Sequence, residues 1–310
     1  TTYTWSPGTF LDVTTGATVI STPTASTTYT VVGTIGTCTA STTVPVIVYS
    51  ATTVTASADV TTGCSPLSTT SHGVGVSSSA VNTYSFAASS GTFTPITGGT
   101  ISTATGDDGT QTSIPIGFPF AYNGTTFTTF GISTNGTIQL GTTATSFSNS
   151  LATIANVIAP IWDDHNLATG SISYLLSGTS PNQVLTVEWN SVAIGGGGST
   201  ANPTNSFQLS LNENGSIQFA YGSLTSANGI TASIGLSGAV GNFISVTPGA
   251  PATSSTVTAN NAISAVTDLP TGTIYTFTPP SVAYSWSPTT NMTGSTTADP
   301  TITGLTTTTT

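Results

Sequence analysis

The sequence has 310 residues, of which 36% are hydrophobic and 3% are charged. Soluble domains usually carry about 25% charged residues. It contains no Lys or Arg and 10 Asp or Glu residues, so its formal net charge at pH 7 is −10. Because no side chain can neutralise a phosphate, a nucleic-acid partner is excluded. The same absence excludes an arginine finger, a P-loop lysine and a polybasic membrane anchor.

The rest of the composition predicts an all-β protein. β-branched and aromatic residues fit pleated strands, whereas Gly, Asn and Pro favour turns. The strong helix formers Lys and Arg are absent, and Glu188 and Glu213 are the only glutamates. A mean hydropathy of +0.23 argues against disorder. The sequence has no apolar run of the length that a membrane-spanning helix needs, so we expect no direct membrane insertion.

A five-residue motif occurs twice, as YTWSP at Tyr3–Pro7 and as YSWSP at Tyr284–Pro288, with an offset of 284 − 3 = 281 residues. The same offset carries Tyr29, which opens a strong strand pattern, to position 310. We therefore expect the chain to start and to stop partway into modules of one kind. It is interpreted as a mature product or an excerpt of a larger protein.

Four parts follow one another along the predicted chain, which we expect to form tandem β-sandwich modules. Residues 1–50 have the short, closely spaced strands of a partial immunoglobulin-like module. Residues 51–83 are richer in Ser and are expected to be a connector with short strands. Residues 84–279 alternate in polarity between Asn-Gly turns and predict a larger, jelly-roll-like sandwich. Residues 280–310 are expected to be the truncated start of a second immunoglobulin-like module.

The terminal segments resemble the repeats of a known family. YTWSP, GATV, PTASTTYTV and GTCTASTTVPVIV are similar to the immunoglobulin-like or PKD-like repeats of giant surface adhesins of Bacteroidota, of the SprB-like gliding-motility type. The resemblance implies a secreted, non-catalytic protein that acts in cell adhesion at the cell surface, with a type IX-like export route. It departs from a true immunoglobulin domain, which has a Cys on either side of its Trp, because no Cys precedes Cys38.

A second resemblance covers the central unit. Its motifs IPIGFPFAYNG, ISTNGTIQL, VIAPIWDDH and GTIYTFTPP are similar to a module of such secreted proteins. The order of its Asn-Gly turn, APIWDD, GSISY, EW and FQ…NG pieces is also similar to nidogen-type extracellular domains. Neither resemblance carries catalytic residues over to this chain.

Each of two acidic pairs is a candidate calcium site. Asp107-Asp108 and Asp163-Asp164 hold four of the 10 acidic residues, on loops with neighbouring Gly or Asn. Calcium takes six to eight oxygen ligands, so these carboxylates are candidate ligands. The alternative is a solvated turn in which each Asp caps its own backbone. No cofactor other than calcium is expected.

The histidines give little support to hydrolysis. His165 follows Asp164, but the nearest nucleophile motif, GLSG at Gly235–Gly238, does not complete G-x-S-x-G. We therefore expect His165 to be a turn residue and His72 to be an exposed loop residue.

Carbohydrate chemistry has weak candidates. Glu188 is expected at an outward strand position and Glu213 in a hairpin turn, which does not favour a glycosidase pair. Four aromatic residues could stack on sugars, although core packing is the preferred interpretation for the first of them: Trp162, Trp189, Tyr174 and Tyr221.

Cys38 and Cys64 lie in no CxxC pair and no Cys/His cluster, which disfavours zinc. They are a candidate disulfide in an oxidising compartment, and the alternative is a partner for Cys38 upstream of Thr1. The predicted function is a structural or adhesive segment of an extracellular filament or giant adhesin. Its expected partners are neighbouring repeats or subunits of the same protein, joined head-to-tail, and surface glycans. The alternative is a glycan-binding sandwich of a secreted protein.

Overall fold

The computed structural model describes residues 1–24, 27–46, 48, 53–76, 80–144, 149–167, 169–194, 205–224, 232–240, 242–248, 254–256, 262–263 and 269–307. The chain forms two compact units, Thr1–Ala51 (unit 1) and Thr52–Thr310 (unit 2). Among the described residues, the short 3-10 turn η1 (Val81–Thr83) is the sole helical element, and no helix is long and apolar enough to cross a bilayer. The predicted all-β class is confirmed.

Unit 1 is a three-stranded antiparallel sheet with little core. Its strands lie in the order β1 (Thr2–Ser6), β2 (Thr27–Ile35) and β3 (Cys38–Val46). Tyr29 is the one fully buried hydrophobic residue described in this unit, and its hydroxyl donates to the Thr9 carbonyl at 3.1 Å. Several apolar side chains stay exposed: Tyr3, Phe10, Val13, Ile20, Ile35 and Val44.

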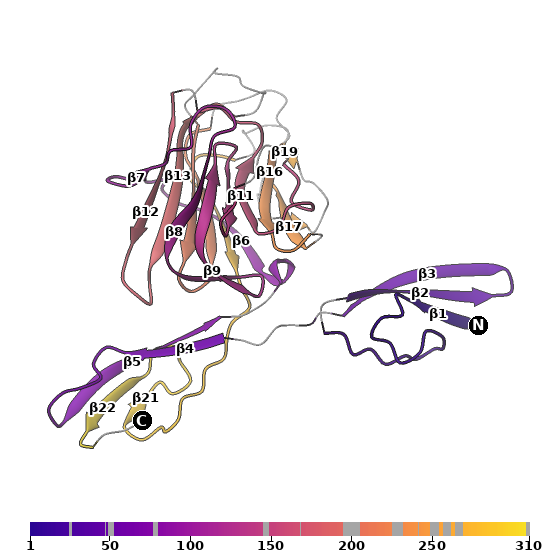
Figure 1. Ribbon diagram of the computed structural model, residues 1–310, viewed down its shortest axis with the longest axis horizontal. Coiled ribbons are helices and arrows are strands. Elements are labelled where there is room, and N and C mark those ends of the chain that lie inside the picture. Colours follow the sequence, from indigo (N-terminus) through magenta and orange to yellow (C-terminus); the bar gives the residue numbers. More distant parts are fainter. Residues whose placement is uncertain are drawn as a thin grey trace. The chain divides into compact units, whose positions relative to one another are not determined.

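Unit 2 contains a two-layer sandwich of antiparallel sheets (Figure 1). One sheet has the order β18 (Ser254–Thr256), β17 (Phe243–Thr247), β16 (Ala232–Ser237), β11 (Val157–Trp162), β10 (Thr137–Leu140), β9 (Thr125–Ser133) and β8 (Thr110–Tyr122), with β19 (Ala262–Ile263) also paired to β16. The other has the order β6 (Ser85–Ser90), β20 (Thr273–Thr278), β15 (Ile217–Tyr221), β14 (Asn205–Asn212), β13 (Val184–Val192), β12 (Ser171–Ser177) and β7 (Thr100–Ile101). Most neighbours are consecutive in sequence, so the layers are largely meanders.

The core lies between the two layers, where alternate residues of each strand point inward. On β14 and β15 the fully buried apolar residues alternate with more exposed ones, as the sequence pattern predicts: Phe207, Leu209, Leu211, Ile217, Phe219 and Tyr221. Two side-chain hydrogen bonds connect one sheet to the other. The Tyr221 hydroxyl donates to the Pro160 carbonyl at 2.8 Å, and Trp189 Nε1 donates to the Ser133 carbonyl at 2.9 Å. Both satisfy polar groups that burial would otherwise penalise.

A third, four-stranded sheet of unit 2 combines two segments far apart in the sequence (Figure 1). Its order is β21 (Met292–Thr293), β22 (Thr301–Leu305), β5 (Leu67–Val76) and β4 (Thr53–Ala58), and β22 pairs with β5. We call residues 53–76 and 281–307 together the split module. Within residues 51–83, the short strands β4 and β5 form a hairpin, which is only marginally stable alone and gains a third strand in β22. The sandwich is inserted between the two halves of this module.

Candidate functional site

Folding brings the two acidic pairs together on one group of loops, which we call the acidic loop cluster (Asp107, Asp108, Asp163 and Asp164). The Asn135 side chain donates to Asp108 Oδ1 at 2.8 Å, while its own Oδ1 accepts the His165 backbone N–H at 2.8 Å. The Thr134 hydroxyl donates to the Asp107 carbonyl. The loop before β8 and the loop after β11 are thus joined through the turn between β9 and β10.

The cluster is electrostatically strained. Burial raises the pKa of Asp164 above its ordinary value, and the charges of Asp107, Asp108 and Asp163 raise it further. Asp163 Oδ1 accepts the Asp164 backbone N–H at 2.9 Å, as in the self-capped turn that was the alternative to calcium. In the described part of the chain, no three His, Cys, Asp or Glu side chains form a group that could hold a metal ion. Calcium binding stays a prediction.

Asp164→Asn should raise the melting temperature at pH 7. A carboxyl whose pKa is raised by folding loses stability when it ionises, so the gain should be absent below the ordinary value of 3.8 and grow as the pH rises above it. For a partly exposed group we expect less than about 1 kcal/mol. Thermal melts between pH 3 and 7 measure this, and a gain that does not change with pH would contradict it.

Calcium gives the same cluster a second test. If the carboxylates bind calcium, millimolar calcium should raise the melting temperature of the wild type by mass action, and raise that of Asp164→Asn less. Equal melts with and without calcium would leave the self-capped turn as the account of these loops.

His165 lies in the loop after β11, and its side chain is fully buried. Its Nε2 lies 2.9 Å from the Ile161 carbonyl, and burial lowers the pKa of its imidazole to about 4. The ring is therefore neutral at pH 7 and donates from Nε2. It positions the loop that carries Asp163 and Asp164.

The two glutamates have structural partners. Glu188 lies on the outer face of β13 but is buried there, and its Oε2 accepts the Ile96 backbone N–H at 2.7 Å and the Gln208 amide at 2.6 Å. Glu213 lies in the predicted hairpin turn and accepts from the Ser180 hydroxyl at 2.7 Å.

The candidate aromatic platform is interior. Trp162, Trp189 and Tyr221 are fully buried and Tyr174 is partly buried, so these four rings form no open stacking surface. Trp189 stacks on Phe207 with ring centroids 5.2 Å apart. The preferred core interpretation of Trp162 is confirmed.

The cysteines lie in different units. Cys38 opens β3 of unit 1, and Cys64 lies in the β4–β5 loop of unit 2. Both are exposed, free thiols in this structure, so their pairing stays a prediction.

Sequence reasoning missed an ion cluster in the split module. His72 is on β5, not on an exposed loop, and its two ring nitrogens each lie 2.8 Å from a carboxylate, Nδ1 from Asp299 and Nε2 from Asp59. The hydrogen bonds to Asp299 and then to Asp59 raise the pKa of His72 above 6.5. Without Lys or Arg in the chain, a protonated His72 is the cation that joins the two halves of the module. Its partners are 13 and 227 residues away, so local spacing gave no signal.

His72→Gln should destabilise the split module in a pH-dependent way. Because folding raises the pKa of this histidine, its contribution is fully present below pH 6.5 and is lost as the pH rises through the folded-state pKa. Both carboxylates are largely exposed, so we expect about 1 kcal/mol, reduced by salt. Thermal melts from pH 5.5 to 8.5 test it, with Asp59→Asn as the variant that keeps one partner. A difference in melting temperature between His72→Gln and wild type that does not change with pH would contradict the ion cluster.

The repeated motif has the same local structure at both ends of the 281-residue offset. Trp5 Nε1 donates to the Gly16 carbonyl at 3.0 Å, and Trp286 Nε1 donates to the Thr297 carbonyl at 2.9 Å. Three further backbone hydrogen bonds recur at the same offset: Trp5 N to Thr14 O with Trp286 N to Ser295 O, Leu11 N to Gly8 O with Met292 N to Thr289 O, and Thr22 N to Phe10 O with Thr303 N to Asn291 O. Residues 284–303 therefore share four hydrogen bonds with residues 3–22.

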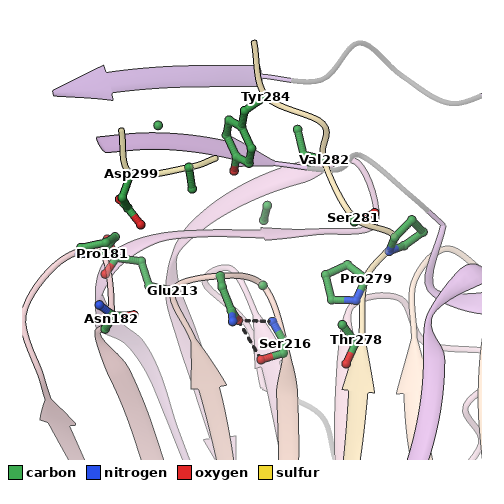
Figure 2. Close-up of a pocket in the computed structure, with 16 residues that line it drawn as sticks. Pro181, Asn182, Glu213, Ser216, Thr278, Pro279, Ser281, Val282, Tyr284 and Asp299 are labelled. Atoms are coloured by element: carbon green, nitrogen blue, oxygen red, sulfur yellow. Dashed lines mark hydrogen bonds between the residues drawn. The ribbon is translucent and has the colours of Figure 1, made fainter. Parts of the chain in front are cut away.

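Two cavities border the split module. Figure 2 shows the smaller, of about 290 Å³, between the Glu213–Ser216 turn of the sandwich, the Pro279–Pro280 linker and Asp299. Its side chains include two carboxylates and no cation. The larger, of about 670 Å³, is a groove between the β4–β5 hairpin and residues 286–307. We call this second cavity the module groove. It is lined by uncharged residues, among them Val60, Leu67, Trp286, Met292, Ile302 and Leu305.

These features define an all-β architecture, a two-layer antiparallel sandwich inserted in a small β-module. Residues 83–279 match the family model described as NIDO related. Since this match covers well over half of the chain, the protein belongs to the NIDO-related family. No curated protein and no solved structure gives a significant match. The matched segment is the sandwich, so the family assignment agrees with the nidogen-type resemblance.

Proposed function

We propose that the chain is a structural and adhesive segment of an extracellular cell-surface filament or giant adhesin, acts without catalysis, and assembles head-to-tail with neighbouring repeats or copies of itself. The observation that carries the proposal is the repeated motif. Residues 3–22 and 284–303 share hydrogen bonds across an offset of 281 residues, as expected for units of a tandem array. The family assignment supports an extracellular setting.

The chemistry of the candidate groups supports a non-catalytic role. His165 is buried and neutral with its Nε2 donating to a carbonyl, and Glu188 is buried against two N–H donors. Both groups hold loops in place. A general acid or base needs to reach a substrate, and neither group is directed to a described cavity.

Immunogold labelling of intact source cells tests the proposal. Antibodies against the purified full chain should decorate surface filaments at a regular spacing along their length. Pre-absorption with the same chain is the control and should abolish the label. Label confined to the cell interior, or free of any surface structure, would contradict the proposal.

A further inference from the structure

The two copies of the repeated motif differ in what pairs with their first strand. In unit 1, β1 pairs with β2 along its whole length, with Trp5 opposite Val31 and Ser6 opposite Thr30. In the split module, the equivalent Ser285–Ser287 belong to no β-ladder of the described chain. In unit 1, β2 therefore covers the edge of the first strand, whereas in the split module no described strand covers the equivalent edge at Ser285–Ser287.

The direction of the open edge follows from the backbone. Successive N–H groups of an extended strand point to opposite sides. Trp286 N–H donates to the Ser295 carbonyl, as Trp5 N–H of β1 donates to the Thr14 carbonyl, and none of the described backbone hydrogen bonds has Ser285 or Ser287 as its donor. In unit 1 the equivalent side faces β2.

The module groove supplies the second observation. In unit 1 the buried Tyr29 of β2 donates its hydroxyl to the Thr9 carbonyl. The 281-residue offset takes Thr9 to Thr290, which lines the module groove together with Trp286 and Pro288. The place that Tyr29 fills in unit 1 is thus part of the groove of about 670 Å³ in the split module.

We propose that the module groove and the Ser285–Ser287 edge receive the β2–β3 hairpin, Thr27–Val46, of a second copy of this chain. The hairpin adds as an antiparallel strand with Trp286 opposite Val31 and Ser287 opposite Thr30 of the second copy, and its Tyr29 fills the groove with the hydroxyl on the Thr290 carbonyl. The inference rests on the proposed head-to-tail assembly and names its contact.

Charge and composition favour this occupant. In a chain of net charge −10, neither the hairpin 27–46 nor the lining of the module groove contains a charged residue. The docked surfaces therefore meet without like-charge repulsion, and β-strand addition needs only backbone partners and pockets for alternate side chains.

Docking of a second copy exchanges one strand for another. The incoming hairpin leaves its own β1, but Tyr3–Pro7 and Tyr284–Pro288 differ at one position only, Thr4 against Ser285. The backbone hydrogen bonds that the hairpin loses to its own β1 are replaced by equivalent bonds to Ser285–Ser287 of the receiving copy. The gain is the apolar wall from the β4–β5 hairpin, with Val60 and Leu67, which unit 1 lacks.

The experiment adds a synthetic peptide of residues 27–46 to the full chain and follows amide hydrogen exchange residue by residue. We expect the peptide to slow exchange at Ser285 and Ser287 and to leave Trp286, already bonded, unchanged. A peptide with Tyr29→Ala is the matched control and should bind roughly tenfold or more weakly, because a buried aromatic anchor is removed. The variants are in the peptide, so folding of the receiving chain is not affected.

Two results would overturn this docking: no slowing at Ser285 and Ser287 at saturating peptide, or equal binding of the Tyr29→Ala peptide. Exchange of the peptide into unit 1 would also leave these two amides unprotected and counts against it. Surface filaments that label with antibody while the peptide fails would leave the proposed function standing without this contact. If the peptide protects Ser285 and Ser287 but the antibody labels only the cell interior, the docking contact would stand and the proposed function would fail.

Discussion

Replacing Trp189 by alanine should cost the sandwich about 3–5 kcal/mol of stability. Its indole is fully buried, stacks on Phe207 and donates to the Ser133 carbonyl of the opposite sheet. The substitution leaves a cavity between the layers and removes a buried hydrogen bond, although the Ser133 carbonyl still accepts from the Gly136 backbone N–H at 3.3 Å. Urea unfolding followed on the sandwich transition measures the loss.

Trp189→Phe is the control, because it keeps an aromatic ring at this position while it removes the Nε1 donor and part of the indole volume. We expect it to lose about 1–3 kcal/mol. If Trp189→Ala unfolds at the same urea concentration as the wild type and loses binding on a glycan array, the core role of Trp189 would be wrong and sugar stacking would be supported.

Gly73→Ala should weaken the hold of the C-terminal half of the split module on β5 by about 1–3 kcal/mol. A Cβ on Gly73 would lie 2.7 Å from Trp286 Cζ2 and 3.3 Å from the Ala298 carbonyl. The indole cannot move aside freely, because its Nε1 donates to the Thr297 carbonyl. Amide exchange across residues 292–305 should speed up, while the sandwich transition stays in place.

Gly63→Ala is the matched control in the same module. Its added Cβ would meet only the end of the flexible Leu67 side chain. We expect a change within about 0.5 kcal/mol, as for most substitutions that touch no tightly packed group. Equal exchange rates in both variants would contradict the packing of Trp286 over Gly73.

Local patterns predicted the sandwich well. The alternation of Phe207, Leu209 and Leu211 with polar residues fixed the inward face of β14, and the β14–β15 turn followed from its Asn-Gly pair. Glu188 shows where the pattern fails. The alternation with Val187 and Trp189 places it on the outer face, but the loop containing Ile96, 92 residues away, covers that face and buries the carboxylate.

Non-local pairing accounts for the other errors. The sequence repeat indicated that residues 284–305 would fold as a module, but not that β22 would pair with β5 across the inserted sandwich. The two acidic pairs were read as separate candidates, and their meeting depends on Asn135, which bridges two loops. His72 met Asp299 for the same reason, because hydrogen bonds between distant segments leave no period in the sequence.

The pairing of β22 with β5 has a mechanical consequence. Thr53 lies opposite Val76 at one end of the split module, and Leu305 lies opposite Leu67 at the other. Tension applied to the chain outside these points runs along the strand direction and loads the hydrogen bonds between β5 and β22 in shear, all at once. The inserted sandwich lies outside this path while the two strands remain paired. The sandwich therefore carries no tension while the split module is intact. Its roughly two hundred residues can extend only after β5 and β22 have separated.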